Sequence, residues 1–276
     1  MVPARGYVPA VATVYSMLLA KDRGATMNVA TKRLAMAVLF LGWALGASAQ
    51  TADDIVEKYL AAIGGRAALA KLTSRSMSGT MTLSTPAGDV SGPVEIVNQQ
   101  PNKSRTLIRM DLSSIGAGQM VFDQRFDGIS GYVLDSLQGN RAITGNQLEN
   151  MKNGSFPSPL LNYKERGATM ELAGKEKVGE RDTYVLIFKP RIGSVVRQYL
   201  DAESYLPLKV MVKVEAPQVG EFEQTTELLD YRTVDGLKIP FLIRSTSSVQ
   251  NSTIAITKVE HNVRIDDTLF SKPGAK

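Results

Sequence analysis

The chain has 276 residues, of which 43% are hydrophobic and 21% are charged, a composition typical of a globular protein. The absence of cysteine excludes disulfide bonds, a thiol nucleophile and thiolate metal ligands, and a single histidine excludes a metal site built from several histidines. The formal net charge of +5 suits a nucleic-acid or other anionic partner only if the basic residues lie in the folded part of the chain.

Residues 1–49 have the features of a secretory leader. The apolar run 34–46 follows two basic residues and ends in an Ala-Ser-Ala sequence. This order predicts a signal peptide that is cleaved after Ala49. A membrane anchor is not expected, because the run is shorter than the ~20 residues that span a bilayer. Translation is expected to start at Met27, which makes the residues before it an upstream extension. No cysteine follows, so we expect that the mature protein is not itself a lipoprotein.

Removal of the leader changes the charge of the chain. Residues 1–49 contain five basic residues and one acidic residue, so residues 50–276 contain 27 basic and 26 acidic residues and carry a net charge of +1. The only tryptophan, Trp43, leaves with the leader. A nearly neutral chain lacks the basic surface that nucleic acid requires. We therefore expect an exported protein whose residues 50–276 form a single domain that does not bind nucleic acid.

The first element of the mature chain is predicted to be a helix over 51–63. Thr51 is a suitable N-cap, and two aspartates follow in the first turn, where the helix dipole favours negative charge. Apolar residues then recur at helical spacing. Gly64 and Gly65 are expected to end the helix, and a short second helical segment follows over 66–72.

From residue 74 onward the apolar residues recur with a period of two, which predicts strands. Tight turns separate these strands, so neighbours are expected to pair antiparallel, because parallel pairing requires helical crossovers. Residues 145–165 interrupt the strands, with a helix predicted over 147–152 and an extended loop over 155–159. The strands are expected from Ser74, around Val94, and at 106–112, 119–126, 131–136, 169–175, 183–189, 195–200, 208–215, 222–231, 237–247 and 253–263.

Several of these strands place methionine or aliphatic residues on one face. A sheet with one apolar face must cover that face or line a cavity with it. Methionine adapts to varied shapes, which suits ligand binding, although an ordinary core face explains any single residue equally well. The candidate lining residues are Met77, Met81, Ile108, Met110, Leu112, Val210 and Val212.

No motif in the chain predicts covalent chemistry. His261 has no accompanying nucleophile motif and is expected to be a partly buried structural residue. The paired carboxylates at 53–54 and 266–267 fit helix caps and turns. A glycine-rich phosphate-binding loop leads into a helix, whereas no helix is predicted after the glycines in 116–118. We therefore expect no catalytic residues, no metal and no cofactor.

Several short segments occur in an order that is similar to that of one known family. They are 61–69, 100–103, 126–128 with 131–132, 200–207, 234–240 and 266–273. On these segments the chain resembles the LolA/LolB-like superfamily of outer-membrane lipoprotein-sorting proteins, in particular a poorly characterised branch. The resemblance implies a mainly β (α+β) fold in which one strongly bent antiparallel sheet forms an unclosed half-barrel, with helices covering its concave face.

The resemblance also implies a cavity that takes lipid acyl chains, where each buried methylene is worth about 0.8 kcal/mol. The leading hypothesis is a monomeric, non-enzymatic periplasmic carrier or binder of a lipid, a lipoprotein acyl chain or another apolar ligand. A lipoprotein or an envelope membrane protein is then a candidate partner. The chain departs from the family twice, because Gln100 replaces a basic residue that helps to hold the lid shut, and residues 50–276 lack the tryptophans of the family's cavities.

Two other classes of function stay open. A periplasmic protein-interaction or envelope sensor module could use the same half-barrel, and a tightly filled concave face would favour it. An exported hydrolase with paired carboxylates is a third, less favoured hypothesis, which requires two close carboxylates in a polar cleft.

Overall fold

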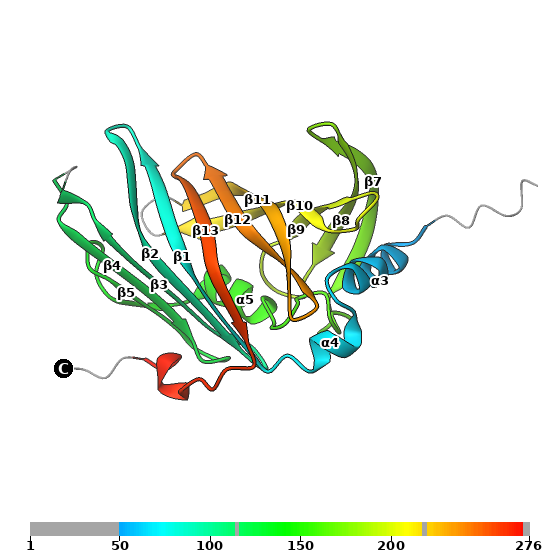
Figure 1. Ribbon diagram of the computed structural model, residues 1–276, viewed down its shortest axis with the longest axis horizontal. Helices are drawn as coiled ribbons and strands as arrows, with labels where there is room; N and C mark the ends of the chain where they lie inside the picture. The colour runs from blue at the N-terminus through cyan, green and yellow to red at the C-terminus, as the bar shows by residue number, and fades with distance from the viewer. Residues whose placement is uncertain (1–49, 114–115, 217–219, 273–276) are drawn as a thin grey trace, which may run out of the picture. The chain divides into compact units, whose positions relative to one another are not determined.

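The computed structural model describes residues 50–113, 116–216 and 220–272. The predicted leader, residues 1–49, lies outside these described residues. Within them, 13 strands form one continuous antiparallel sheet that is not closed, and the helices other than the short C-terminal one lie along one of its faces (Figure 1). This arrangement confirms the mainly β fold and the single unclosed antiparallel sheet.

The elements follow the predicted order. The strands are β1 (Ser74–Thr85), β2 (Gly88–Gln99), β3 (Lys103–Asp111), β4 (Gln119–Phe126), β5 (Gly131–Asp135), β6 (Arg141–Ile143), β7 (Thr169–Val178), β8 (Arg181–Lys189), β9 (Val196–Asp201), β10 (Pro207–Ala216), β11 (Gly220–Val234), β12 (Leu237–Ser247) and β13 (Asn251–His261). The helices are α3 (Ala52–Ala62), α4 (Arg66–Ala70), α5 (Gly145–Asn153) and the 3-10 helix η3 (Asp267–Leu269). Strand β6 and helix η3 were not predicted, because three residues are too few to show a hydrophobic period. None of the described helices is long and apolar enough to cross a membrane.

The chain runs through the sheet as a meander in two halves. Strands β1 to β6 follow one another outward from the centre, strands β7 to β13 return from the other edge, and β1 pairs with β13 where the halves meet. The edge strands are therefore β6 and β7, and α5 lies between them in the chain. In space, α5 lies in the hollow of the bent sheet (Figure 1). The last helix before the second half of the sheet thus occupies the mouth of the half-barrel.

Helix α3 begins with the predicted cap. The Asp54 N–H donates to Thr51 Oγ1 at 3.2 Å, and the Thr51 N–H donates to Asp54 Oδ2 at 2.9 Å, which makes a capping box. Ile55, Val56 and Leu60 of this helix are buried in the main core. The apolar stripe of the sequence is therefore the face that packs against the sheet.

The turn between α3 and α4 requires glycine. Gly64 has a φ of +133°, and a Cβ atom there would lie 2.5 Å from Leu237 Cδ2. The neighbouring Ile63 carbonyl accepts a hydrogen bond from the Lys238 N–H at 3.1 Å. This close approach fixes the helical module against the β11–β12 turn.

The face of the sheet that carries the helices is called the concave face below. Met77 of β1 lies on it, because Met77 belongs to the same core cluster as Ile55 and Leu60 of α3. Strands β1 and β2 pair without a bulge, so Met81 shares the face of Met77. The pairing of each strand with the next then assigns the side chains of the other strands to this face or to the outer one.

The outer face carries a buried ion cluster. Asp123 of β4 accepts hydrogen bonds from the guanidinium groups of Arg105 at 2.8 Å and Arg125 at 2.7 Å, and its side chain is 4% exposed. The C-terminal segment lies over the same strands, where Arg125 donates to the Ser271 carbonyl at 3.4 Å and Phe270 is fully buried. This part of the outer face is therefore covered by the chain itself.

Candidate ligand-binding site

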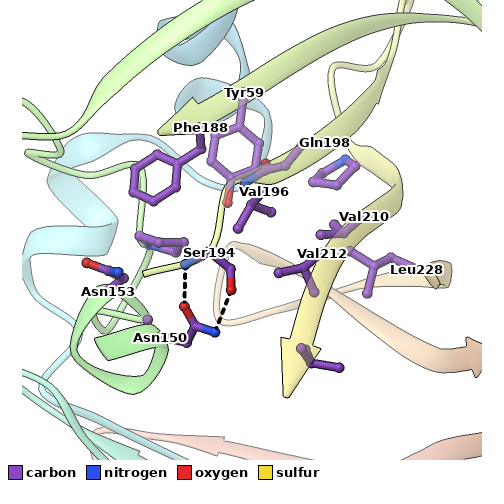
Figure 2. Close-up of a pocket in the computed structure, with 14 residues that line it drawn as sticks. Tyr59, Asn150, Asn153, Phe188, Ser194, Val196, Gln198, Val210, Val212 and Leu228 are labelled. Carbon is purple, nitrogen blue, oxygen red and sulfur yellow. Dashed lines mark hydrogen bonds between the residues drawn. The ribbon is translucent and has the colours of Figure 1, made fainter. Parts of the chain in front are cut away.

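A pocket of about 400 Å³ opens on the concave face between strands β8 to β11 and the segment that contains α5 (Figure 2). Its volume falls within the range of small-molecule sites, roughly 300–1,000 Å³. None of the side chains that line it is charged. We call it the valine pocket after its apolar wall, which consists of Phe188, Val196, Val210, Val212, Val214 and Leu228.

The valine wall follows from the alternation of β10. Val210, Val212 and Val214 point to the pocket, whereas the intervening residues point to the outer face. Val212 pairs across the strands with Val196 of β9, and Val210 pairs with Gln198. Branched side chains pack closely on such a pleated surface, so the wall is a smooth apolar strip.

The opposite side of the pocket comes from the helices and the loop after α5. Tyr59 of α3 extends over the pocket (Figure 2). Its hydroxyl lies 3.2 Å from Ser158 Oγ. Burial raises the pKa of the Tyr59 phenol, so this side chain is neutral at physiological pH. The tyrosine therefore adds an uncharged ring to the pocket.

Three asparagines hold α5 across the mouth of the half-barrel, and one of them, Asn153, donates to the Ile192 carbonyl in the β8–β9 loop at 2.7 Å. Asn150 donates to Ser194 Oγ at 3.0 Å and accepts from the Ser194 N–H at 2.8 Å (Figure 2). Asn102, in the turn between β2 and β3, donates to the carbonyls of Met151 and Lys152 at 3.2 and 2.7 Å. The helix is therefore tied to the β8–β9 loop on one side and to the β2–β3 turn on the other.

The resembled family has a basic residue at the position of Gln100 that helps to hold the lid shut. In the structure the Gln100 N–H donates to the Thr73 carbonyl at 2.9 Å. The side chain that reaches α5 is that of Asn102, two residues later. A neutral amide thus adds hydrogen bonds to two carbonyls in the last turn of the helix, one of which, that of Met151, also accepts from the Gly154 N–H at 3.1 Å.

Replacement of Asn150 by alanine is expected to speed the exchange of a bound ligand, because α5 loses both hydrogen bonds to Ser194. Each such bond is worth about 1 kcal/mol. Stopped-flow release of an apolar fluorescent probe would measure the exchange. Lys152→Ala is the matched control, since it removes only an exposed pair with Glu149 on the same helix. An unchanged release rate in Asn150→Ala would show that the two hydrogen bonds to Ser194 do not limit ligand exchange.

The seven candidate lining residues fall in three places. Val210 and Val212 line the valine pocket. Met77 belongs to the main core under α3. Met81, Ile108, Met110 and Leu112 belong to a second cluster, in which all but Met81 are buried.

The second cluster shares the concave face but not the pocket. Ile108 pairs with Val94 of β2, which lies on the face of Met77. Met110 is 2% exposed, so the cluster is filled. Leu228 of the pocket wall pairs with Ile243 of β12, which pairs with Ile254 of β13, and Ile254 packs against the second cluster. This apolar row connects the two regions of the concave face, and ligand contact by the second cluster stays a hypothesis.

Several pocket residues were not singled out from the sequence. Phe188, Val196 and Leu228 lie in predicted strands, and Tyr59 lies in the apolar stripe of the predicted helix. Their alternation was visible. Their convergence depends on which strands lie opposite α5, and a periodic pattern does not contain that information.

The polar residues weighed for chemistry have structural roles. His261 Nδ1 lies 3.0 Å from Asp235 Oδ2, and the histidine side chain is 3% exposed. Asp54 completes the capping box of α3, and Asp266 caps η3 by accepting from the Thr268 N–H at 2.9 Å. Among the described residues, no three histidine or carboxylate side chains gather closely enough to hold a metal ion.

Comparison with known proteins identifies the fold. No protein-family model matches the sequence, and no curated protein matches it. A LolA superfamily protein from Nitrosomonas europaea has a similar structure, with a TM-score of 0.52 and 16% identity over 80% of this chain and 98% of that chain. An outer membrane lipoprotein-sorting protein domain from Vibrio parahaemolyticus has a TM-score of 0.52 and 13% identity, over 79% of this chain and 94% of that chain. A DUF1329 family protein from Desulfovibrio piger has a TM-score of 0.53 and 13% identity, over 80% of this chain and 98% of that chain. The chain therefore has the fold of the LolA superfamily, as the resemblance of its sequence implied.

Proposed function

We propose that this protein is an exported, non-enzymatic binder or carrier of an apolar ligand, such as a lipid or the acyl chain of a lipoprotein, and that the ligand occupies the valine pocket. The observation that carries the proposal is an uncharged pocket of about 400 Å³ whose wall is made of valine, leucine and phenylalanine side chains. Such a wall offers an acyl chain an extended apolar surface.

The hydrophobic effect can supply the affinity. Burial of about ten methylenes gives a gross gain on the order of 8 kcal/mol, from which the lost freedom of association is subtracted. A site of this kind therefore discriminates by chain length, because each methylene outside the pocket contributes little. The pocket supports a ligand with one extended apolar chain.

The cellular setting of the proposal comes from the sequence and the fold. The leader predicted over residues 1–49 directs the chain out of the cytoplasm, and residues 50–276 would be the mature domain. The similar structure from Vibrio parahaemolyticus is described as an outer membrane lipoprotein-sorting protein domain. Both support a periplasmic carrier whose partner is a lipoprotein or an envelope membrane protein.

The alternative functions are less well supported. An interaction module would fill its concave face, whereas here the valine pocket is open between α5 and the sheet. A carboxylate-based hydrolase would place acidic side chains in the cleft, and no aspartate or glutamate lines this pocket.

Titration of the purified protein with an apolar fluorescent probe tests the proposed function. We expect saturable binding of one probe per chain, with displacement by long-chain amphiphiles and weaker displacement by short ones. A linear, unsaturable fluorescence response, or competition that does not depend on chain length, would contradict the proposal.

A further inference from the structure

Arg75 is a positive charge on the concave face without a counterion in the described structure. It lies two residues before Met77 on β1 and pairs with Asn98 of β2 and His261 of β13. Its guanidinium carbon lies 5.4 Å from the centre of the Phe156 ring. Its buried Nε has no hydrogen-bond partner among the described residues, and the described ion pairs do not include it.

The groups around Arg75 do not neutralise it. The ionisable side chain that influences it is Tyr59, and burial raises the pKa of that phenol. Burial likewise raises the pKa of Tyr231. Tyr231 lines a small pocket, distinct from the valine pocket, together with Arg75 and Tyr59. Both phenols are therefore neutral. Burial lowers the pKa of Arg75, yet arginine stays charged at physiological pH because its ordinary pKa is far above 7.

Arg75 faces a second pocket, of about 290 Å³, that we call the amide pocket. Its polar lining includes Asn98, Asn102, Ser104 and Gln124. Asn98 pairs with Ser104 as well as with Arg75, so the three side chains form one row on the concave face. The charge therefore lies beside several neutral groups that can donate hydrogen bonds.

The amide pocket and the valine pocket share a wall. Gly154 and Pro159, in the segment after α5, line both. The two pockets therefore adjoin, and a ligand that occupies both would have its apolar part against Val210 and Val212 and its other end beside Arg75.

We propose that Arg75 binds the anionic head of the ligand, a carboxylate or a phosphate, while the apolar tail occupies the valine pocket. This inference rests on the proposed function and specifies its ligand as an anionic amphiphile. A guanidinium presents a planar fork of N–H donors that matches the two oxygens of a carboxylate or phosphate. An unpaired charge in an apolar site is unfavourable, and an anion from the ligand would supply the missing partner.

The test compares ligands that differ only in the head. Isothermal titration of the wild-type protein with dodecanoate, dodecyl phosphate and dodecanol measures the contribution of the charge at a constant tail. We expect the two anions to bind at least about tenfold more tightly than the alcohol, which corresponds to about 1.4 kcal/mol. Inorganic phosphate and acetate alone are expected to bind far more weakly, because they lack the tail.

Arg75→Met should reduce the affinity for both anions to that for dodecanol and leave dodecanol binding unchanged. Arg109→Met is the matched control, because Arg109 lies on the outer face of β3 in an exposed pair with Glu95. This control should keep the preference for anions.

The outcomes separate the two proposals. Equal binding of dodecanoate and dodecanol by the wild-type protein overturns the role of Arg75 and leaves the apolar-ligand proposal standing, whether or not Arg75→Met folds. An anion preference that survives in a folded Arg75→Met also overturns it. Inorganic phosphate that binds as tightly as dodecyl phosphate overturns the assignment to an amphiphile. Failure of all three twelve-carbon ligands to bind overturns both proposals.

Discussion

Replacement of Val212 by aspartate is expected to weaken the binding of an apolar probe by about 30-fold, or about 2 kcal/mol. Val212 lines the valine pocket next to Val196, and a carboxylate there would face the ligand's apolar chain without a partner. Fluorescence titration measures the loss directly.

Met211→Asp is the matched control for this effect. Met211 is the preceding residue of β10 and points to the outer face, where it pairs with Arg197 of β9. Both variants exchange an apolar residue for aspartate in the same strand. We expect Met211→Asp to bind the probe within about twofold of wild type. Equal weakening in the two variants would locate the site elsewhere or reveal a general loss of folding, which circular dichroism distinguishes.

Replacement of Asp123 by alanine is expected to lower the free energy of unfolding by about 3–5 kcal/mol, because it leaves two buried guanidinium groups without their carboxylate. Asp123 is 4% exposed, and Arg105 and Arg125 are 13% and 15% exposed. For a unit of this size the loss corresponds to a Tm lower by roughly 6–20 °C. Thermal and urea unfolding would measure it.

Asp182→Ala is the control for Asp123→Ala, because its pair with Lys177 is about two-thirds exposed on both sides. An exposed pair contributes about 0–1 kcal/mol. A change in Asp123→Ala no larger than in Asp182→Ala would show that the outer-face cluster does not stabilise the fold.

The stabilisation by Asp123 is also expected to depend on pH. Burial alone would raise the pKa of this carboxyl, but the hydrogen bonds from Arg105 and Arg125 outweigh burial and lower the pKa below its ordinary value. A carboxyl with a lowered pKa stabilises the folded state above its unfolded pKa, about 3.9, and loses this contribution as the pH falls through the folded value. The difference in the free energy of unfolding between wild type and Asp123→Ala should therefore shrink below about pH 4.

Local patterns predicted the strands well where alternation and turns agreed. Strands β4 and β12 were predicted to the residue, because an Asp-Gly turn follows β4 and another precedes β12. Strand β6 offered only three residues and was missed. The pairing of β1 with β13, which joins the two halves of the sheet, involves segments far apart in the chain. The bent half-barrel was therefore expected from the family resemblance and not from periodicity.

The site was predicted only in part, because periodicity shows which face of a strand is apolar but not what lies opposite that face. Alternation placed Val210, Met110 and the other candidate residues on an apolar face, and the pairing register agrees with that assignment. Periodicity could not show that Val210 borders a pocket while Met110 lies in a filled cluster. That difference depends on where α5 crosses the sheet. Arg75 shares the face of Met77 in the alternation, yet its missing counterion becomes visible only in three dimensions.

Mass spectrometry of the native protein tests the central claim most directly. The protein is purified from the cell envelope without detergent, its intact mass is measured under native conditions, and the bound material is extracted and identified. The account predicts an added mass of one lipid or acylated molecule per chain, present on wild type and on Met211→Asp and absent from Val212→Asp. A wild-type protein that carries no apolar molecule and takes up none from lipid vesicles would contradict it.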